Sequence, residues 1–139
     1  MSDAPVPIED YSGEEFGCAR CWPASADVAW EMQQQLRLDR TLVDDAHYRV
    51  LVLACEACGQ RYLHAFSEII DWISSEDPQE RTRLPITVPE LEALSALANL
   101  SPHDLQSIGS RRKSLRYSWP KGSPAVRFWS RGIVVYPHD

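Results

Sequence analysis

Cys18-Ala19-Arg20-Cys21 and Cys55-Glu56-Ala57-Cys58-Gly59 decide the fold expected of this chain, because these two pairs contain all four of its cysteines. Two residues between the thiols allow one tight turn to direct both sulfur atoms at one ion. Two such turns supply the four ligands of a closed, tetrahedral site. The spacing therefore predicts that Cys18, Cys21, Cys55 and Cys58 hold one structural Zn²⁺.

The residues around the second pair have the pattern of a hairpin. Residues 48–54 form a β-branched and apolar run of strand length that ends at Cys55, and residues 60–66 continue as its partner. Gly59 suits the position after Cys58, because glycine adopts a positive φ without steric cost. Strand, cysteine turn and strand in this order predict a zinc ribbon with the second pair at the hairpin tip. The first pair departs from the pattern, since Trp22-Pro23 follows it instead of glycine.

A helix is expected between the two cysteine pairs, as an insertion in the ribbon. Ser25 is a suitable N-cap, and Val28, Met32 and Leu36 recur at intervals of four. This spacing predicts one apolar stripe, with the polar side chains turned away from it: Gln33, Gln34 and Arg37. Asp44 and Asp45 indicate a turn before the first ribbon strand.

The second half of the chain predicts two short helices and then strands. Thr87-Val88-Pro89-Glu90 and Ser101-Pro102-His103-Asp104 both have helix-start signals. Their apolar positions are Leu91, Leu94, Leu97 and Ala98 in the first helix, and Leu105 and Ile108 in the second, which Gly109 ends. Between the ribbon and these helices, residues 69–73 form an apolar cluster and residues 82–86 a short extended piece. Residues 114–119, 125–129 and 133–136 alternate as a hairpin or a three-stranded meander.

These elements predict an α+β fold in one compact domain of 1–139. Residues 1–17 are expected to be an irregular arm, residues 18–73 the zinc ribbon with its inserted helix, and residues 84–136 the helices and C-terminal strands. The start of the chain has no basic patch followed by an apolar run, and no stretch is long enough to cross a bilayer. We therefore expect a soluble, cytoplasmic protein, whose paired thiols are metal ligands or redox centres rather than disulfides.

The charge distribution raises a second hypothesis. The formal net charge is −6, yet residues 111–131 contain seven basic side chains and no acidic one. Basic groups beside aromatic rings are typical of single-stranded nucleic acid binding. The residues that could make this contact are Arg111, Arg112, Lys113, Arg116, Trp119, Arg127 and Trp129. The alternative is that the aromatic rings face the core while the cations face solvent or pair with the acidic part of the chain. The carboxylates of residues 68–80 are expected to form a solvated acidic edge.

The segment from Cys55 to Leu63 resembles the second half of zinc-ribbon proteins, and Cys18 to Cys21 matches the first half. The longer stretch through Phe66, Asp71-Trp72, Asp77-Pro78 and Leu84-Pro85 is similar to small bacterial proteins of no assigned activity that also carry a ribbon. The resemblance implies zinc at the four cysteines and a β-rich core. It brings no catalytic residues to this chain.

The sequence therefore favours a non-enzymatic zinc domain, in which the metal organises a platform for another macromolecule. A protein partner is the first expectation, and the domain would then act as an adaptor or as an antidote to a toxin. The alternative is a nucleic-acid-binding protein that uses the basic, aromatic segment. A third possibility, a thiol oxidoreductase, would require a cysteine pair at the start of a helix that follows a strand.

Overall fold

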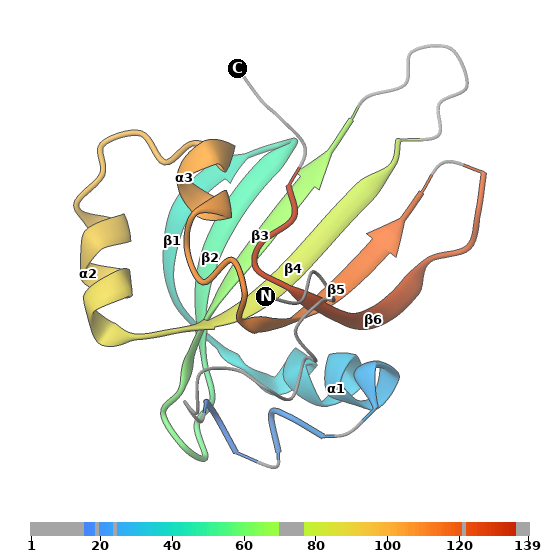
Figure 1. The fold of residues 1–139 in the computed structure, drawn as a ribbon, viewed down its shortest axis with the longest axis horizontal. Coiled ribbons are helices and arrows are strands. Elements are labelled where there is room, and N and C mark those ends of the chain that lie inside the picture. The colour runs from blue at the N-terminus through green and yellow to red at the C-terminus, as the bar shows by residue number, and fades with distance from the viewer. Residues whose placement is uncertain (1–15, 19, 24, 70–76, 121, 136–139) are drawn as a thin grey trace, which may run out of the picture.

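A computed structural model describes residues 16–18, 20–23, 25–69, 77–120 and 122–135 (Figure 1). The strands are β1 (Arg37–Asp45), β2 (Tyr48–Ala54), β3 (Arg61–Glu68), β4 (Gln79–Ile86), β5 (Lys113–Trp119) and β6 (Val126–Arg131). The helices are α1 (Ala26–Met32), α2 (Val88–Ser95) and α3 (Pro102–Gln106), with a 3-10 turn, η1 (Gln33–Gln35), after α1. None of the helices in these ranges is long and apolar enough to cross a membrane.

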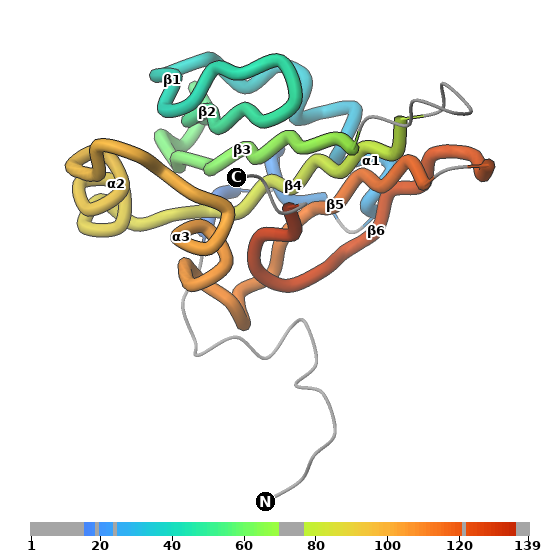
Figure 2. The backbone as a smooth tube through the Cα atoms, turned by 90° about the horizontal axis from the view of Figure 1, so that it is seen from above, coloured from blue at the N-terminus to red at the C-terminus, as the bar shows by residue number. Residues whose placement is uncertain are grey.

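All six strands belong to one antiparallel sheet, and their order in the sheet is their order in the chain (Figures 1 and 2). This overturns the predicted architecture of a zinc ribbon followed by two helices and a separate hairpin. β2 and β3 do pair around the second cysteine pair, but β3 also pairs with β4 along its whole length. β4 then pairs with β5. The expected ribbon hairpin is therefore the first half of a continuous sheet.

One face of the sheet, called the core face, packs against α2, α3 and the C-terminal segment. Its central residues are Val50, Leu63 and Leu84, which are buried on neighbouring strands. Leu94 and Leu105 cover them from the two helices. This cluster has more buried residues than either of the other two apolar clusters. Since burial of apolar surface contributes about 25 cal/mol per Å², it is the main hydrophobic core of the described fold.

The opposite face, called the α1 face, is covered in part by α1. Ala29 and Trp30 of the helix pack on Leu115 of β5, and the Trp30 ring stacks on that of Tyr117 at 4.9 Å between centroids. The buried side of α1 is therefore not the predicted one. Val28 and Met32 are exposed, whereas Gln33 is fully buried, because the ring of Trp30 provides the larger apolar contact area.

The strand β1 lies where the sequence predicted the end of a helix and a turn. The helix ends at Met32, and Leu36 has an extended backbone that leads into β1. β1 is an edge strand with two irregularities in its pairing with β2. Most of its side chains are exposed or half-buried, so it lacks the alternation of apolar and polar residues on which strand prediction depends.

The strand β4 is longer than the predicted extended piece 82–86. It begins at Gln79 and includes Glu80, Arg81 and Arg83 in a central position of the sheet. Residues 70–76, and with them most of the predicted apolar cluster at 69–73, lie outside the described residues. The first part of β4 is missed because charged side chains usually indicate an exposed surface or a loop, so a prediction from the hydrophobic pattern does not place them in a central strand.

The two helix-start signals are present. Thr87 and Ser101 each form a capping box, with Glu90 and Asp104 respectively. However, α2 ends at Ser95, so Leu97 lies beyond the helix and is exposed. Of the two alternatives predicted for the C-terminal residues, a hairpin or a three-stranded meander, the described residues show the hairpin. β5 and β6 form it as part of the continuous sheet, and Ile133 and Val135 pack into the core without forming a strand.

Candidate metal centre

The four cysteines come from two turns that the fold brings together. Cys18 and Cys21 lie in a turn before α1, closed by the bond from Cys21 N to Cys18 O at 3.1 Å. Cys55 and Cys58 lie at the tip of the β2–β3 hairpin, where Gly59 N donates to Cys55 O at 2.7 Å. Gly59 has the predicted positive φ, +79°. Local turn geometry thus directs each pair, and the sheet places the second pair against the first.

The sulfur separations fit one tetrahedral ion. The Sγ atom of Cys18 lies 3.8 Å from that of Cys21 and 4.0 Å from that of Cys55, and the Sγ atoms of Cys21 and Cys58 are 4.0 Å apart. All four lie within 4.8 Å of one another. A tetrahedron with metal–sulfur bonds of about 2.3 Å has edges of about 3.8 Å. The four cysteines are therefore positioned to hold one metal ion.

Tyr62 supports this cluster from β3. Its side chain is fully buried, and its hydroxyl donates a hydrogen bond to Cys21 Sγ at 2.9 Å. Burial, followed by the contact with Cys21, raises the pKa of Tyr62, so the hydroxyl stays a donor. Such hydrogen bonds from outside the ligand set orient ligands and tune their basicity. Tyr62 lies in the predicted strand 60–66, but the sequence does not indicate this contact.

The protonation of the first pair depends on its surroundings. The backbone N–H of Cys21, followed by that of Arg20, lowers the pKa of the Cys18 thiol to about 7. Burial raises the pKa of Cys21, and the hydrogen bond from Tyr62 opposes that rise. Since metals bind thiolates, the donors around this pair favour the form that a metal requires.

Two further residues hold the first turn in place. Gly17 has a φ of +74°, and a Cβ atom there would lie 2.4 Å from Tyr62 Oη and 2.7 Å from Cys21 Sγ. The Nε2 group of buried Gln33 donates to Cys21 O at 2.7 Å, which ties η1 to the turn. The end of the predicted arm 1–17 is thus part of the site, although the sequence assigned no role to it.

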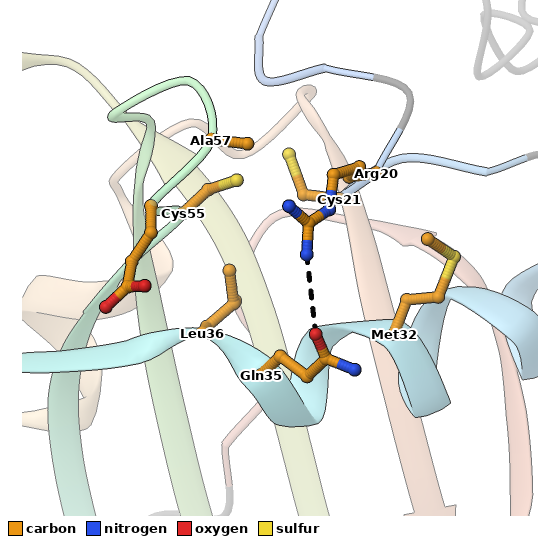
Figure 3. A pocket seen from close by; sticks show the side chains of 8 residues that line it. Arg20, Cys21, Met32, Gln35, Leu36, Cys55 and Ala57 are labelled. Atoms are coloured by element: carbon orange, nitrogen blue, oxygen red, sulfur yellow. Dashed lines mark hydrogen bonds between the residues drawn. The ribbon is translucent and has the colours of Figure 1, made fainter.

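A pocket of about 200 Å³ opens beside two of the cysteines (Figure 3). Cys21 and Cys55 line it together with side chains of η1 and the second turn, and Arg20 Nη2 donates to Gln35 Oε1 across it at 3.4 Å. Four thiolates complete a tetrahedral coordination shell. The pocket therefore borders a cluster in which the four cysteines can occupy every coordination position of a tetrahedral ion.

The residues predicted to contact nucleic acid do not form one surface. Arg112 pairs with Glu90 at 2.7 Å, and Arg116 pairs with the buried Glu80 on the core face. On the α1 face, Lys113 Nζ lies 4.3 Å from the ring centroid of Trp129, and Arg127 lies 3.3 Å from Glu31. Arg111 and Trp119 are exposed.

The predicted acidic edge is only partly a solvated surface. Glu68 accepts a bond from His47 at 2.8 Å, and Glu80 is buried and accepts from Ser118 Oγ. Residues 71 and 76 lie outside the described residues. His64 is also buried and accepts a hydrogen bond from Arg83 Nε at 3.1 Å.

Comparison of the chain with protein-family models, with curated proteins and with solved structures found no significant match. The resemblance to zinc-ribbon proteins is therefore supported by the cluster of four cysteines and not by a related protein. The class that the geometry defines is a small protein built on a six-stranded antiparallel sheet, with a four-cysteine cluster at one hairpin tip.

Proposed function

We propose that the four cysteines bind one structural Zn²⁺ and that the domain is a non-enzymatic binding protein for another macromolecule. The observation that carries this proposal is the approach of four sulfur atoms to within 4.8 Å of one another. Zinc is the metal that four-thiolate tetrahedral sites of this spacing usually hold. A closed shell of this kind has no position for a water molecule or a substrate.

The test is a native mass spectrum of freshly purified protein, with a thiol titration of the same sample. We expect one zinc ion per chain and four protected thiols. A mass increment for iron would contradict zinc. A metal-free chain with four reactive thiols would contradict the structural site and favour the oxidoreductase hypothesis.

The zinc would act as a structural link between elements far apart in the sequence. It would join the turn before α1 to the β2–β3 tip, and α1 in turn packs on β5 and β6. Metal binding would thereby place α1 on the sheet and define the surface around it. We propose that this surface is where the partner binds.

A protein partner, including a toxin for which the domain is an antidote, is the first form of this proposal. It predicts a stoichiometric complex that is recovered by affinity capture in mild salt and survives nuclease treatment. Recovery of no such complex would remove this form of the proposal, while the metal measurement would still decide the structural site.

A further inference from the structure

A row of arginine and aromatic side chains crosses five strands on the α1 face. The strand register makes Arg49, Phe66, Arg81, Tyr117 and Arg127 consecutive neighbours from β2 to β6. Directly paired residues of antiparallel strands project to the same face. The five side chains therefore alternate cation and ring along one line, next to α1.

The guanidinium groups stack on the rings between them. Arg81 lies 4.7 Å from the ring centroid of Phe66 and 5.3 Å from that of Tyr117. Arg49 lies 5.8 Å from the Phe66 centroid, and Arg127 lies 5.7 Å from that of Tyr117. Stacking fixes the orientation of a guanidinium and leaves its N–H edge available for an anion.

Arg81 lacks a carboxylate partner among the described residues. Its only side-chain hydrogen bond in that part of the chain is from Nη1 to Gln79 Oε1 at 2.9 Å. Arg83, two residues along the same strand face, is 6% exposed, and its Nη1 has no hydrogen-bond partner in the described structure. Glu68 is an acidic group whose charge acts on Arg81, but its two oxygens already accept hydrogen bonds from His47 and Gln79. Among the described residues, neither of these neighbouring cations therefore has a carboxylate in direct contact, which favours the binding of an anion nearby.

The outer arginines are paired only at the surface. Arg49 lies 3.7 Å from Asp44, and Arg127 lies 3.3 Å from Glu31 and 3.8 Å from Asp27. These three carboxylate side chains are each more than 60% exposed. Exposed ion pairs contribute little and exchange readily, so a phosphate can take the place of any of these three carboxylates.

An exposed indole lies beside this row. Trp119 is 48% exposed and follows Tyr117 by two residues on β5, so both side chains project to the α1 face. The three arginines lie on alternate strands, about 10 Å apart at a strand spacing of about 4.8 Å. A flat, cationic face with an exposed ring suits an extended strand with phosphates and bases, whereas an acidic peptide would use the charges and not the indole.

We propose that this row is a binding site for single-stranded nucleic acid, with Arg49, Arg81 and Arg127 on phosphates and Trp119 stacked on a base. The site differs from the segment 111–131 that the sequence indicated, because two of its arginines come from β2 and β4. The inference rests on the proposed function only in its general form, a zinc-stabilised binding protein for a macromolecule, and takes a nucleic acid in place of a protein as that macromolecule. The zinc-linked α1 borders the site.

The test is fluorescence polarisation of the zinc-loaded full chain with labelled DNA and RNA single strands of about 15 nucleotides. We expect saturable binding at about 50 mM salt that weakens steeply as salt rises. Arg49→Gln and Arg127→Gln should each weaken binding about three- to tenfold, and together lower the salt slope by about 1.4, which corresponds to two phosphate contacts. Trp119→Ala should weaken binding about tenfold.

Arg37→Gln is the matched control, because the Arg37 and Arg49 side chains are both 52% exposed and both have surface ion pairs. Arg37 pairs with Ala54 in the sheet, and both side chains project to the face opposite the row. The Arg37→Gln variant should therefore bind as the wild type does. Equal effects of Arg37→Gln and Arg49→Gln would overturn the site. Equal affinity for duplex and single strand would overturn the stacking role of Trp119.

Two further outcomes separate this inference from the proposed function. A folded, zinc-loaded chain that binds no oligonucleotide, or that binds polyglutamate instead, would overturn the nucleic-acid site and leave the structural zinc intact. A chain without zinc would overturn the metal proposal whatever its affinity for nucleic acid. The metal content and melting temperature of each variant are measured in the same samples.

Discussion

The hydroxyl of Tyr62 donates a hydrogen bond to the Sγ atom of Cys21 at 2.9 Å. Tyr62 comes from β3 and Cys21 from the turn before α1, so this bond joins the sheet to the first half of the cysteine cluster. Because Cys21 is buried, the Tyr62 hydroxyl supplies a hydrogen bond of the kind that water would donate to an exposed thiolate.

Tyr62→Phe should therefore lower the affinity for zinc about 10- to 100-fold without changing the stoichiometry. Competition with a coloured chelator measures this affinity directly. Tyr48→Phe is the control, since the buried Tyr48 hydroxyl donates to Leu100 O at 2.9 Å, away from the cysteines. If both variants weaken metal binding equally, the effect is one of general stability and the Tyr62 bond has no special part in it.

Gly17→Ala should destabilise the metal centre, because the added methyl group would overlap Tyr62 Oη and Cys21 Sγ. Gly122→Ala is the matched control: Gly122 has a φ of +76°, close to the +74° of Gly17, and an added Cβ would meet nothing within 4 Å. Both variants bear the strain of a positive φ, about 1 kcal/mol. Thermal unfolding of the zinc-loaded variants should therefore show the larger loss for Gly17→Ala, and equal losses would contradict the close packing.

The features that the sequence predicted correctly depend on few neighbouring residues. The clustering of the cysteines follows from two turns, and the capping boxes follow from residues three positions apart. The support from Tyr62, Gly17 and Gln33 could not be predicted in this way, because these contacts join elements that only the folded sheet brings together. The positive φ of Gly17 has no signal in the sequence pattern, because Gly17 precedes the first cysteine pair, whereas the glycine typical of such turns follows the second cysteine of a pair, as Gly59 does.

The six-stranded sheet was missed for a different reason. β4 contains Arg81 and Arg83 at its centre, where a pattern-based prediction expects apolar residues. In the folded chain, stacking on Phe66, Tyr117 and Trp30 lets these arginines occupy such positions. β1 has an edge position and lacks a buried face. Without β1 and the first part of β4, the remaining strands read as two separate hairpins.

Removal of zinc should loosen one part of the fold and spare another. Cys18, Cys21 and Cys55 pack in a cluster with Leu53 and Tyr62 that is separate from the main core. After chelation, hydrogen exchange should therefore accelerate in residues 16–36 and 53–62, and much less in α2, whose Leu91 and Leu94 belong to the main core. Equal acceleration in α2 would show that the metal stabilises the whole sheet.

Arg112 should contribute to stability rather than to ligand binding. It makes two hydrogen bonds to Glu90, at 2.7 and 3.2 Å, and a third to Pro85 O at 2.9 Å. We expect Arg112→Ala to lower the free energy of unfolding by about 2–3 kcal/mol. Arg111→Ala, at an exposed neighbouring position, should change it by less than about 0.5 kcal/mol. Urea unfolding measures both, and a small loss for Arg112→Ala would return this residue to the candidates for a binding surface.

His64 should make the stability of the fold depend on pH below neutrality. Burial, followed by the charges of Arg83 and Arg81, lowers the pKa of His64 from 6.5 to about 3. Above pH 6.5 the imidazole is neutral in both the folded and the unfolded chain. As the pH falls from 6.5 toward 3, the unfolded chain takes up a proton that the folded chain does not, so stability decreases by up to about 1.4 kcal/mol per pH unit.

Urea unfolding at pH 7.5 and 5.5 can isolate this contribution. The wild type should lose about 1.4 kcal/mol more than His64→Asn between these two values, because asparagine keeps an acceptor for Arg83 Nε and does not titrate. His103→Asn is the control, since it removes a histidine from an exposed position and leaves the His64–Arg83 contact in place, so the loss that is due to His64 should persist in it. Protonation of the cysteines affects all three proteins alike and cancels in the comparison. An unchanged pH dependence in His64→Asn would mean that His64 is protonated in the folded chain, and the buried pair with Arg83 could then not have the geometry described.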